Sequence, residues 1–115
     1  MTLAAHLDFA QLDQLALEGG AELVVELSHI FIEDVSARLK LLEQACAQGD
    51  ERALRRVAHR IRGGSGTFGA LGLSEIAAEL EAADAGPHRD QLMIKLGQEF
   101  SRVKVAIEDR LTALG

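Results

Sequence analysis

The sequence predicts an all-α fold, an antiparallel up-down four-helix bundle with a short extra helix at the N-terminus. The first observation is composition: the 115 residues contain no Trp or Tyr, four Phe and one Pro, and strands favour aromatic and β-branched side chains. The second is that apolar residues recur every three or four positions in successive segments, as on one face of a helix. Amphipathic helices joined by short turns pack most simply as an up-down bundle. We expect the whole chain, 1–115, to be one such domain.

The N-terminal half predicts a short helix followed by a long one. Asp8 is a suitable N-cap for a helix that ends at Gly19-Gly20 and would lie over the bundle as a lid. The long helix ends at Gly49, and its apolar stripe comprises Val24, Leu27, Phe31, Val35, Leu39, Leu42 and Cys46. Because Cys46 lies on this stripe, we expect a small core residue and not a nucleophile. Leu23, Ile30 and Ile32 lie outside this stripe and are candidates for an apolar docking rim.

Three helices are predicted in the C-terminal half. Asp50 is a suitable N-cap for a helix that runs to about Phe68. The next helix carries apolar residues from Leu73 to Ala83 and closes near Gly86-Pro87. The last helix has a heptad-like seam formed by Leu92, Leu96, Phe100, Val103, Ile107, Leu111 and Leu114.

Charge and targeting signals restrict the function classes. A net charge of −6 argues against nucleic acid as a partner. Five of the twelve Lys and Arg residues fall within 52–62, a stretch without Asp or Glu, which indicates one local docking site for an anionic partner. No apolar run approaches the roughly 20 residues of a membrane span, and no secretory signal pattern opens the chain. We therefore expect a cytoplasmic monomer without membrane association.

Three kinds of catalytic or ligand site find little support. Residues 64–69 fit G-x-G-x-x-G, but a dinucleotide fingerprint follows a strand and opens a helix, whereas these glycines close one. The histidines are His6, His29, His59 and His88, and none has a second ligand at the spacing of a metal site. No Ser stands on a strand-to-helix elbow, so a hydrolase is not indicated.

His59 is the candidate functional residue. A lone histidine on a helix is usually an ordinary surface residue, but at 100° per residue His59 lies opposite the apolar face. Its stripe also contains Arg52, Arg55, Arg56, Arg62, Gly63 and Gly66. Neutral imidazole is a good nucleophile, and nearby guanidinium groups disfavour its charged form and match phosphate oxygens. Since Gly in a helix interior costs about 1 kcal/mol relative to Ala, Gly63 and Gly66 indicate close approach of a partner.

The segment around His59 reads Ala58-His59-Arg60-Ile61-Arg62-Gly63-Gly64-Ser65, followed by Gly69-Ala70, Leu73 and Leu80-Glu81. It resembles the pattern of histidine-containing phosphotransfer (HPt) domains, loosely A-H-x-L-K-G-S-S, then G-A-x-x-L, then L-E. The resemblance implies a four-helix bundle in which His59 is the phosphoacceptor. Arg62 takes the place of the usual Lys to stabilise the phosphoryl group, and Gly63 leaves room beside the ring. Gly64 and Gly66 depart from the family pattern, which more usually has small polar residues or Ala at these two positions.

The resemblance also implies the partners, namely receiver domains of hybrid sensor kinases and response regulators. One receiver aspartate would donate the phosphoryl group and another would accept it, both docking on a face with Arg52, Arg55, Arg56 and Gly66. With no ATP site visible, the expected role is a phosphoryl carrier without a cofactor of its own, Mg²⁺ being in the receiver. The alternative is a non-catalytic helical module that binds receivers or other signalling proteins through the same basic face. The pattern does not choose between the two ring nitrogens.

Overall fold

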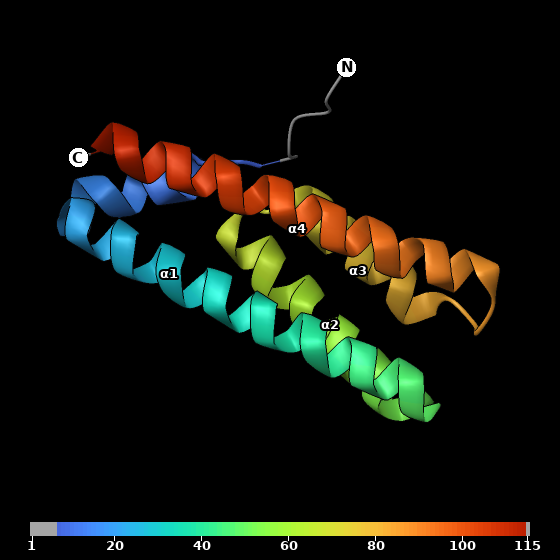
Figure 1. Cartoon of the computed structure of the whole chain (residues 1–115). Coiled ribbons are helices and arrows are strands. Elements are labelled where there is room, and N and C mark those ends of the chain that lie inside the picture. Colours follow the sequence, from blue (N-terminus) through green and yellow to red (C-terminus); the bar gives the residue numbers. More distant parts are fainter. Residues whose placement is uncertain (1–6, 115) are drawn as a thin grey trace, which may run out of the picture.

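The computed structural model describes residues 7–114, which form four helices and no strand (Figure 1). These are α1 (Ala10–Gln48), α2 (Glu51–Phe68), α3 (Leu71–Ala82) and α4 (Pro87–Leu114). Each helix packs against the next one in the chain, and α1 also packs against α4. The described part is therefore an up-down bundle, and the predicted fold class is confirmed.

The predicted extra helix is the first part of α1. Gly20 has φ 81° and ψ 172°, a conformation that interrupts the helix and that glycine adopts without steric cost. Before this break the chain lies across one end of the bundle, where Leu12 is buried and Asp13 pairs with Arg110 of α4. The residue predicted as N-cap was wrong by one position, because Phe9 precedes the first helical residue. Asp8 nevertheless accepts a hydrogen bond from the backbone N–H of Ala10 at 2.9 Å.

Both ends of α2 follow from local sequence. The Asp50 carboxylate accepts a hydrogen bond from the backbone N–H of Ala53 at 3.1 Å, as predicted for an N-cap. Gly69 ends the helix with φ 97°, and a Cβ there would collide with the carbonyl oxygen of Asp8. The backbone N–H of Asp8 in turn donates to the Gly69 carbonyl at 2.8 Å. Glycine at this position thus permits the N-terminal segment to cross the α2–α3 turn.

One predicted helix end needs correction, and one residue of the predicted α4 seam has a side chain outside the described part of the structure. The helix α3 ends at Ala82 and not near Gly86, because Ala83 is already extended with φ −81° and ψ 140°. The predicted seam of α4 is buried from Leu92 to Ile107 and half-buried at Leu111. The side chain of Leu114 lies outside the described part of the structure.

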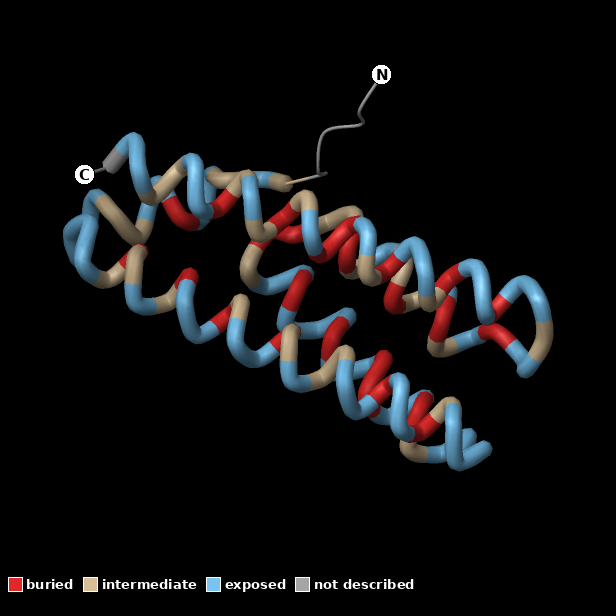
Figure 2. Tube along the Cα trace, in the orientation of Figure 1, coloured by how far each residue is buried: buried red, intermediate tan, exposed pale blue. Residues whose placement is uncertain are grey.

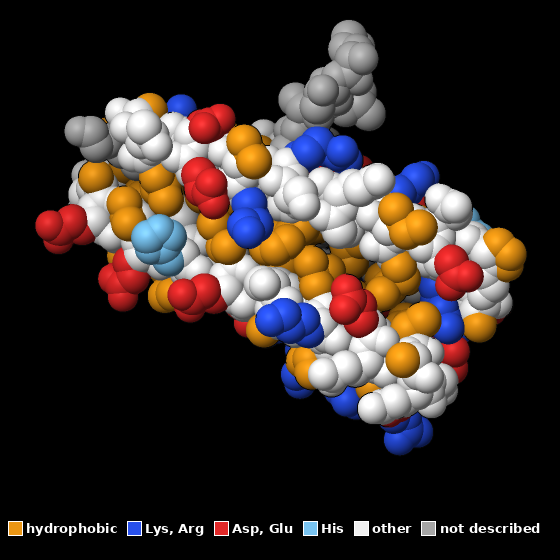
Figure 3. Space-filling model, viewed as in Figure 1, with side chains coloured by type: hydrophobic (Ala, Val, Ile, Leu, Met, Phe, Trp, Pro, Cys, Tyr) orange, Lys and Arg blue, Asp and Glu red, His pale blue; other side chains and the backbone are white. Residues whose placement is uncertain are grey.

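The core runs along the axis of the bundle between the helices (Figure 2). Its fully buried side chains include Leu42 of α1, Ile61 of α2, Leu80 of α3 and Leu96 of α4. Cys46 is half-buried against this core, in agreement with its predicted packing role. On the face shown in Figure 3, apolar side chains remain visible between α1 and α4.

A buried arginine ties α2 to α4. The side chain of Arg89 is 6% exposed, and its Nη1 donates to Oε2 of Glu51 at 2.5 Å. The hydrogen bond and positive charge of Arg89 lower the pKa of Glu51, and the same bond raises the pKa of Arg89. Because a buried cation requires a partner, this pair fixes the first turn of α2 against the first turn of α4.

Candidate functional site

His59 lies in the middle of α2 on its exposed face, as the helical periodicity predicted. Its side chain is 66% exposed, whereas Ala58 and Ile61 beside it are buried in the core. The core face of α2 therefore holds the helix in place while the imidazole is presented to solvent.

A carboxylate from α3 binds the ring. Oε1 of Glu81 lies 2.9 Å from Nδ1 of His59, and Oε2 of the same carboxylate accepts from Nη1 of Arg62 at 3.3 Å. Since an ionised carboxylate only accepts, Nδ1 carries the hydrogen in this contact and the lone pair of the neutral ring resides on Nε2. The helical periodicity predicted the nearby arginines and did not place this carboxylate among the neighbours of His59. Glu81 was part of the sequence pattern but was not identified as a site residue.

The local packing of α2 on α3 supports this cluster. Ser74 of α3 donates from its hydroxyl to the backbone carbonyl of Arg62 at 2.9 Å. A Cβ at Gly66 would lie 3.4 Å from that same hydroxyl oxygen, and Gly66 is exposed beside α3. A Cβ at Gly63 would meet nothing within 4 Å. The fold itself thus leaves space at Gly63, one turn after His59.

The predicted basic patch divides into two parts. Arg55 and Arg62 face α3, where Nη2 of Arg55 lies 3.4 Å from Oδ1 of Asp84 and Arg62 binds Glu81. Arg52 and Arg56 are exposed, and no carboxylate lies within ion-pair distance of either in residues 7–114. The positive charge available to a partner therefore lies on the exposed face of α2 that carries Arg52 and Arg56.

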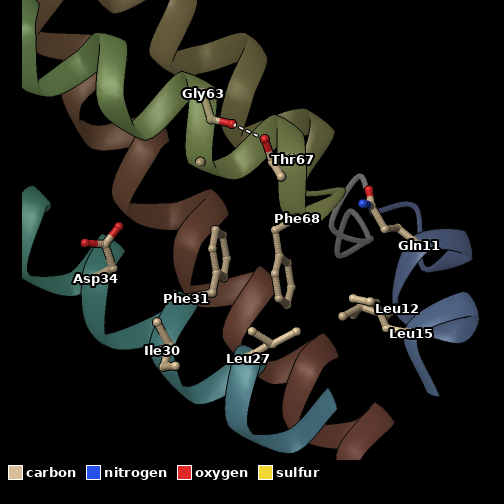
Figure 4. A pocket seen from close by; sticks show the side chains of 11 residues that line it. Gln11, Leu12, Leu15, Leu27, Ile30, Phe31, Asp34, Gly63, Thr67 and Phe68 are labelled. Atoms are coloured by element: carbon tan, nitrogen blue, oxygen red, sulfur yellow. Dashed lines mark hydrogen bonds between the residues drawn. The ribbon is translucent and has the colours of Figure 1, made fainter. Parts of the chain in front are cut away.

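An apolar groove of about 400 Å³ lies beside Gly63, between α2 and the two parts of α1 (Figure 4). The rings of Phe31 and Phe68 stack in it, with centroids 4.1 Å apart. Its lining also includes Gln11, Leu12, Leu15, Leu27, Ile30, Asp34, Gly63, Gly64 and Thr67. Of the apolar residues predicted outside the α1 stripe, Ile30 is 54% exposed and lines the groove, whereas Leu23 and Ile32 are half-buried.

The other histidines do not form a site in the described part of the chain. His29 and His88 are exposed, and His6 lies outside the described residues. Within residues 7–114, no three or more His, Cys, Asp or Glu side chains lie together in a group that could hold a metal ion. Over the same residues, no helix has the length and hydropathy needed to cross a membrane.

Comparisons with known proteins agree with the pattern around His59. The model of the Hpt domain family matches residues 26–114. The crystal structure of histidine-containing phosphotransfer protein B from Pseudomonas aeruginosa PAO1 superposes with a TM-score of 0.86 at 30% sequence identity. That similarity covers 96% of this chain and 98% of the other. A comparison with curated protein sequences found no match.

Proposed function

The chain belongs to the Hpt domain family, and from this premise we propose that His59 carries the phosphoryl group. Members of the family are phosphocarriers in phosphorelays and not kinases. The observation that carries the assignment is the contact of Glu81 with Nδ1 of His59 at 2.9 Å. It gives an exposed imidazole a defined tautomer, with Nε2 as the nucleophilic nitrogen.

The transfer proceeds in line on the phosphorus of a receiver aspartyl phosphate. Nε2 of His59 forms the new bond to phosphorus, while the bond between phosphorus and the aspartyl oxygen breaks and its electron pair returns to the carboxylate. The ring keeps its Nδ1 hydrogen throughout because Glu81 accepts it, so that neutral imidazole is both the attacking and the leaving form of the ring. Transfer to the next receiver reverses these steps. Because phosphoryl transfer is loose, positioning and charge supply most of the catalysis, with Mg²⁺ in the receiver.

Donor and acceptor receivers dock on one surface, since both must reach Nε2 of the same residue. We place on it the predicted contacts Arg52, Arg55, Arg56 and Gly66, with Gly63 giving room beside the ring. The exposed side chain of Ile30 and the groove next to Gly63 extend this surface towards α1. Since His59, Arg62 and Glu81 come from one chain, a monomer is sufficient for the reaction.

The experiment that tests this function is incubation with a phosphorylated receiver domain, followed by measurement of label on this protein. We expect label that is lost in acid and retained in base, as for phosphohistidine. His59→Gln should stay folded, because the side chain is exposed, and should accept no label.

His29→Gln and His88→Gln are the matched controls, since both residues are exposed but lack a neighbouring cluster, and both variants should accept label normally. Full labelling of His59→Gln would refute the assignment. Binding of receivers without any labelling of the native protein would instead favour the non-catalytic interaction module.

A further inference from the structure

One carboxylate serves two functional groups of the site. Glu81 uses Oε1 for Nδ1 of His59 at 2.9 Å and Oε2 for Nη1 of Arg62 at 3.3 Å. Its side chain is 28% exposed, compared with 66% for His59 and 52% for Arg62. It stands on α3 next to Leu80, which is fully buried. Glu81 is thus the most buried of the three side chains, and about half of the long Arg62 side chain is exposed.

Phosphorylation of His59 creates a competitor for Arg62. A phosphoryl group adds a charge of roughly −1.5 to −2 and three acceptor oxygens. It would lie on the ring whose other nitrogen is bound to Glu81, one helical turn from Arg62. Guanidinium groups bind phosphate oxygens strongly and often with two parallel hydrogen bonds. Because Arg62 contacts Glu81 through Nη1, it either divides its positive charge between Glu81 and the phosphoryl group or leaves Glu81 for the phosphoryl group.

We propose that Glu81 keeps the phosphohistidine short-lived and high in transfer potential, because it competes with the phosphoryl group for Arg62. This inference rests on the proposed role of His59 as phosphoacceptor. In either arrangement, two anionic groups share the positive charge of Arg62, and the carboxylate of Glu81 repels the phosphoryl oxygens. Both effects favour departure of the phosphoryl group.

Glu81 also favours breaking of the bond between Nε2 of His59 and phosphorus. When the Nε2–P bond breaks, its electron pair stays on Nε2 and the phosphoryl group passes to a receiver carboxylate oxygen or to water. Because Glu81 keeps the hydrogen on Nδ1, imidazole leaves as a neutral ring and not as an anion. The carboxylate therefore assists loss of the phosphoryl group through both of its oxygens.

The test uses potassium phosphoramidate, which needs no receiver. Nε2 forms a bond to phosphorus, the P–N bond of the reagent breaks and ammonia leaves. The reaction is run in a background with His6→Gln, His29→Gln and His88→Gln, so that His59 is the remaining histidine. The lifetime of the phosphohistidine is then followed by phosphorus NMR, and thermal unfolding checks that each variant is folded.

Glu81→Gln should lengthen the lifetime at least threefold, because the neutral amide still accepts from Nδ1 but releases Arg62. Glu79→Gln is the matched control, since it removes the same charge from an exposed position on the same helix, and should leave the lifetime unchanged. Nitrogen NMR of the unphosphorylated ring should show the Nδ1–H tautomer kept in Glu81→Gln and reduced in Glu81→Ala. A merely structural role for Glu81 would not move this tautomer ratio.

Arg62→Gln completes a double-mutant cycle. Alone it should shorten the lifetime, and in its presence Glu81→Gln should have less than half of its original effect. A Glu81→Gln lifetime equal to or shorter than that of the native chain would overturn the inference, as would a full Glu81→Gln effect in the Arg62→Gln background. Failure of receivers to label His59 would instead refute the proposed function, which this chemical assay does not involve.

Discussion

Replacing Gly63 separates the stability of the fold from the function of its surface. Gly63 lies inside α2, and a Cβ there would meet nothing within 4 Å, so no internal contact requires glycine. Gly63→Ala should therefore stabilise the protein by about 1 kcal/mol, the difference in helix propensity. With an unfolding entropy of about 2.1 cal/mol/K per residue, this corresponds to a Tm increase of about 4 °C for a chain of this length. Gly63→Gln should also raise Tm, by somewhat less.

The functional effect should have the opposite sign. Gly63 follows His59 by one turn, so a Gln side chain there would stand between the imidazole and an approaching receiver. An increase of about 1.4 kcal/mol in the activation free energy lowers a rate tenfold. We expect Gly63→Gln to lower the rate of receiver-to-His59 transfer at least about tenfold. Gly63→Ala, with one added methyl group, should lose less.

Gly97 provides the matched control for this comparison. It lies inside α4, and a Cβ there also meets nothing within 4 Å. Gly97→Ala and Gly97→Gln should raise Tm as their Gly63 counterparts do and leave the transfer rate unchanged. If Gly63→Gln is more stable and transfers at the native rate, Gly63 has no docking role and the reasoning fails.

Two further predictions concern charge. Arg56→Glu should slow receiver association more than Arg55→Glu at low salt, because Asp84 already neutralises Arg55. In stopped-flow measurements, the association rates of the two variants should converge at high salt. A larger effect of Arg55→Glu would contradict the division of the basic patch into two parts. The ion pair with Arg89 lowers the pKa of Glu51 below 4.5. The contribution of this ion pair to stability is therefore present above about pH 4.5 and is lost as the pH falls through the lower pKa of Glu51 in the folded state. The stability difference between the native chain and Glu51→Gln in urea unfolding should therefore shrink from about pH 6 to about pH 3, and a constant difference would show that the pair does not titrate as proposed.

Local patterns were sufficient for much of the bundle. The cap at Asp50, the end of α2 at Gly69 and the break at Gly20 each depend on the conformational preferences of one or two residues. The exposure of His59 follows from its angular position relative to Leu54 and Ile61, because 100° per residue assigns every side chain of a helix to a face. These features do not require knowledge of what packs against the helix.

Contacts between helices were decided by the tertiary structure. Glu81 lies 22 residues from His59 in the sequence, and nothing in the periodicity of α3 indicates which residue of α2 its carboxylate reaches. Likewise, the sequence does not show that Arg89 is buried against Glu51 or that Ile30, unlike Leu23 and Ile32, is exposed in a groove. The position along each helix and the rotation about its axis depend on how all the apolar faces pack together. The sequence by itself therefore determined the helices and the exposed histidine, and the packing of α2 against α3 and α1 determined the chemical surroundings of that histidine.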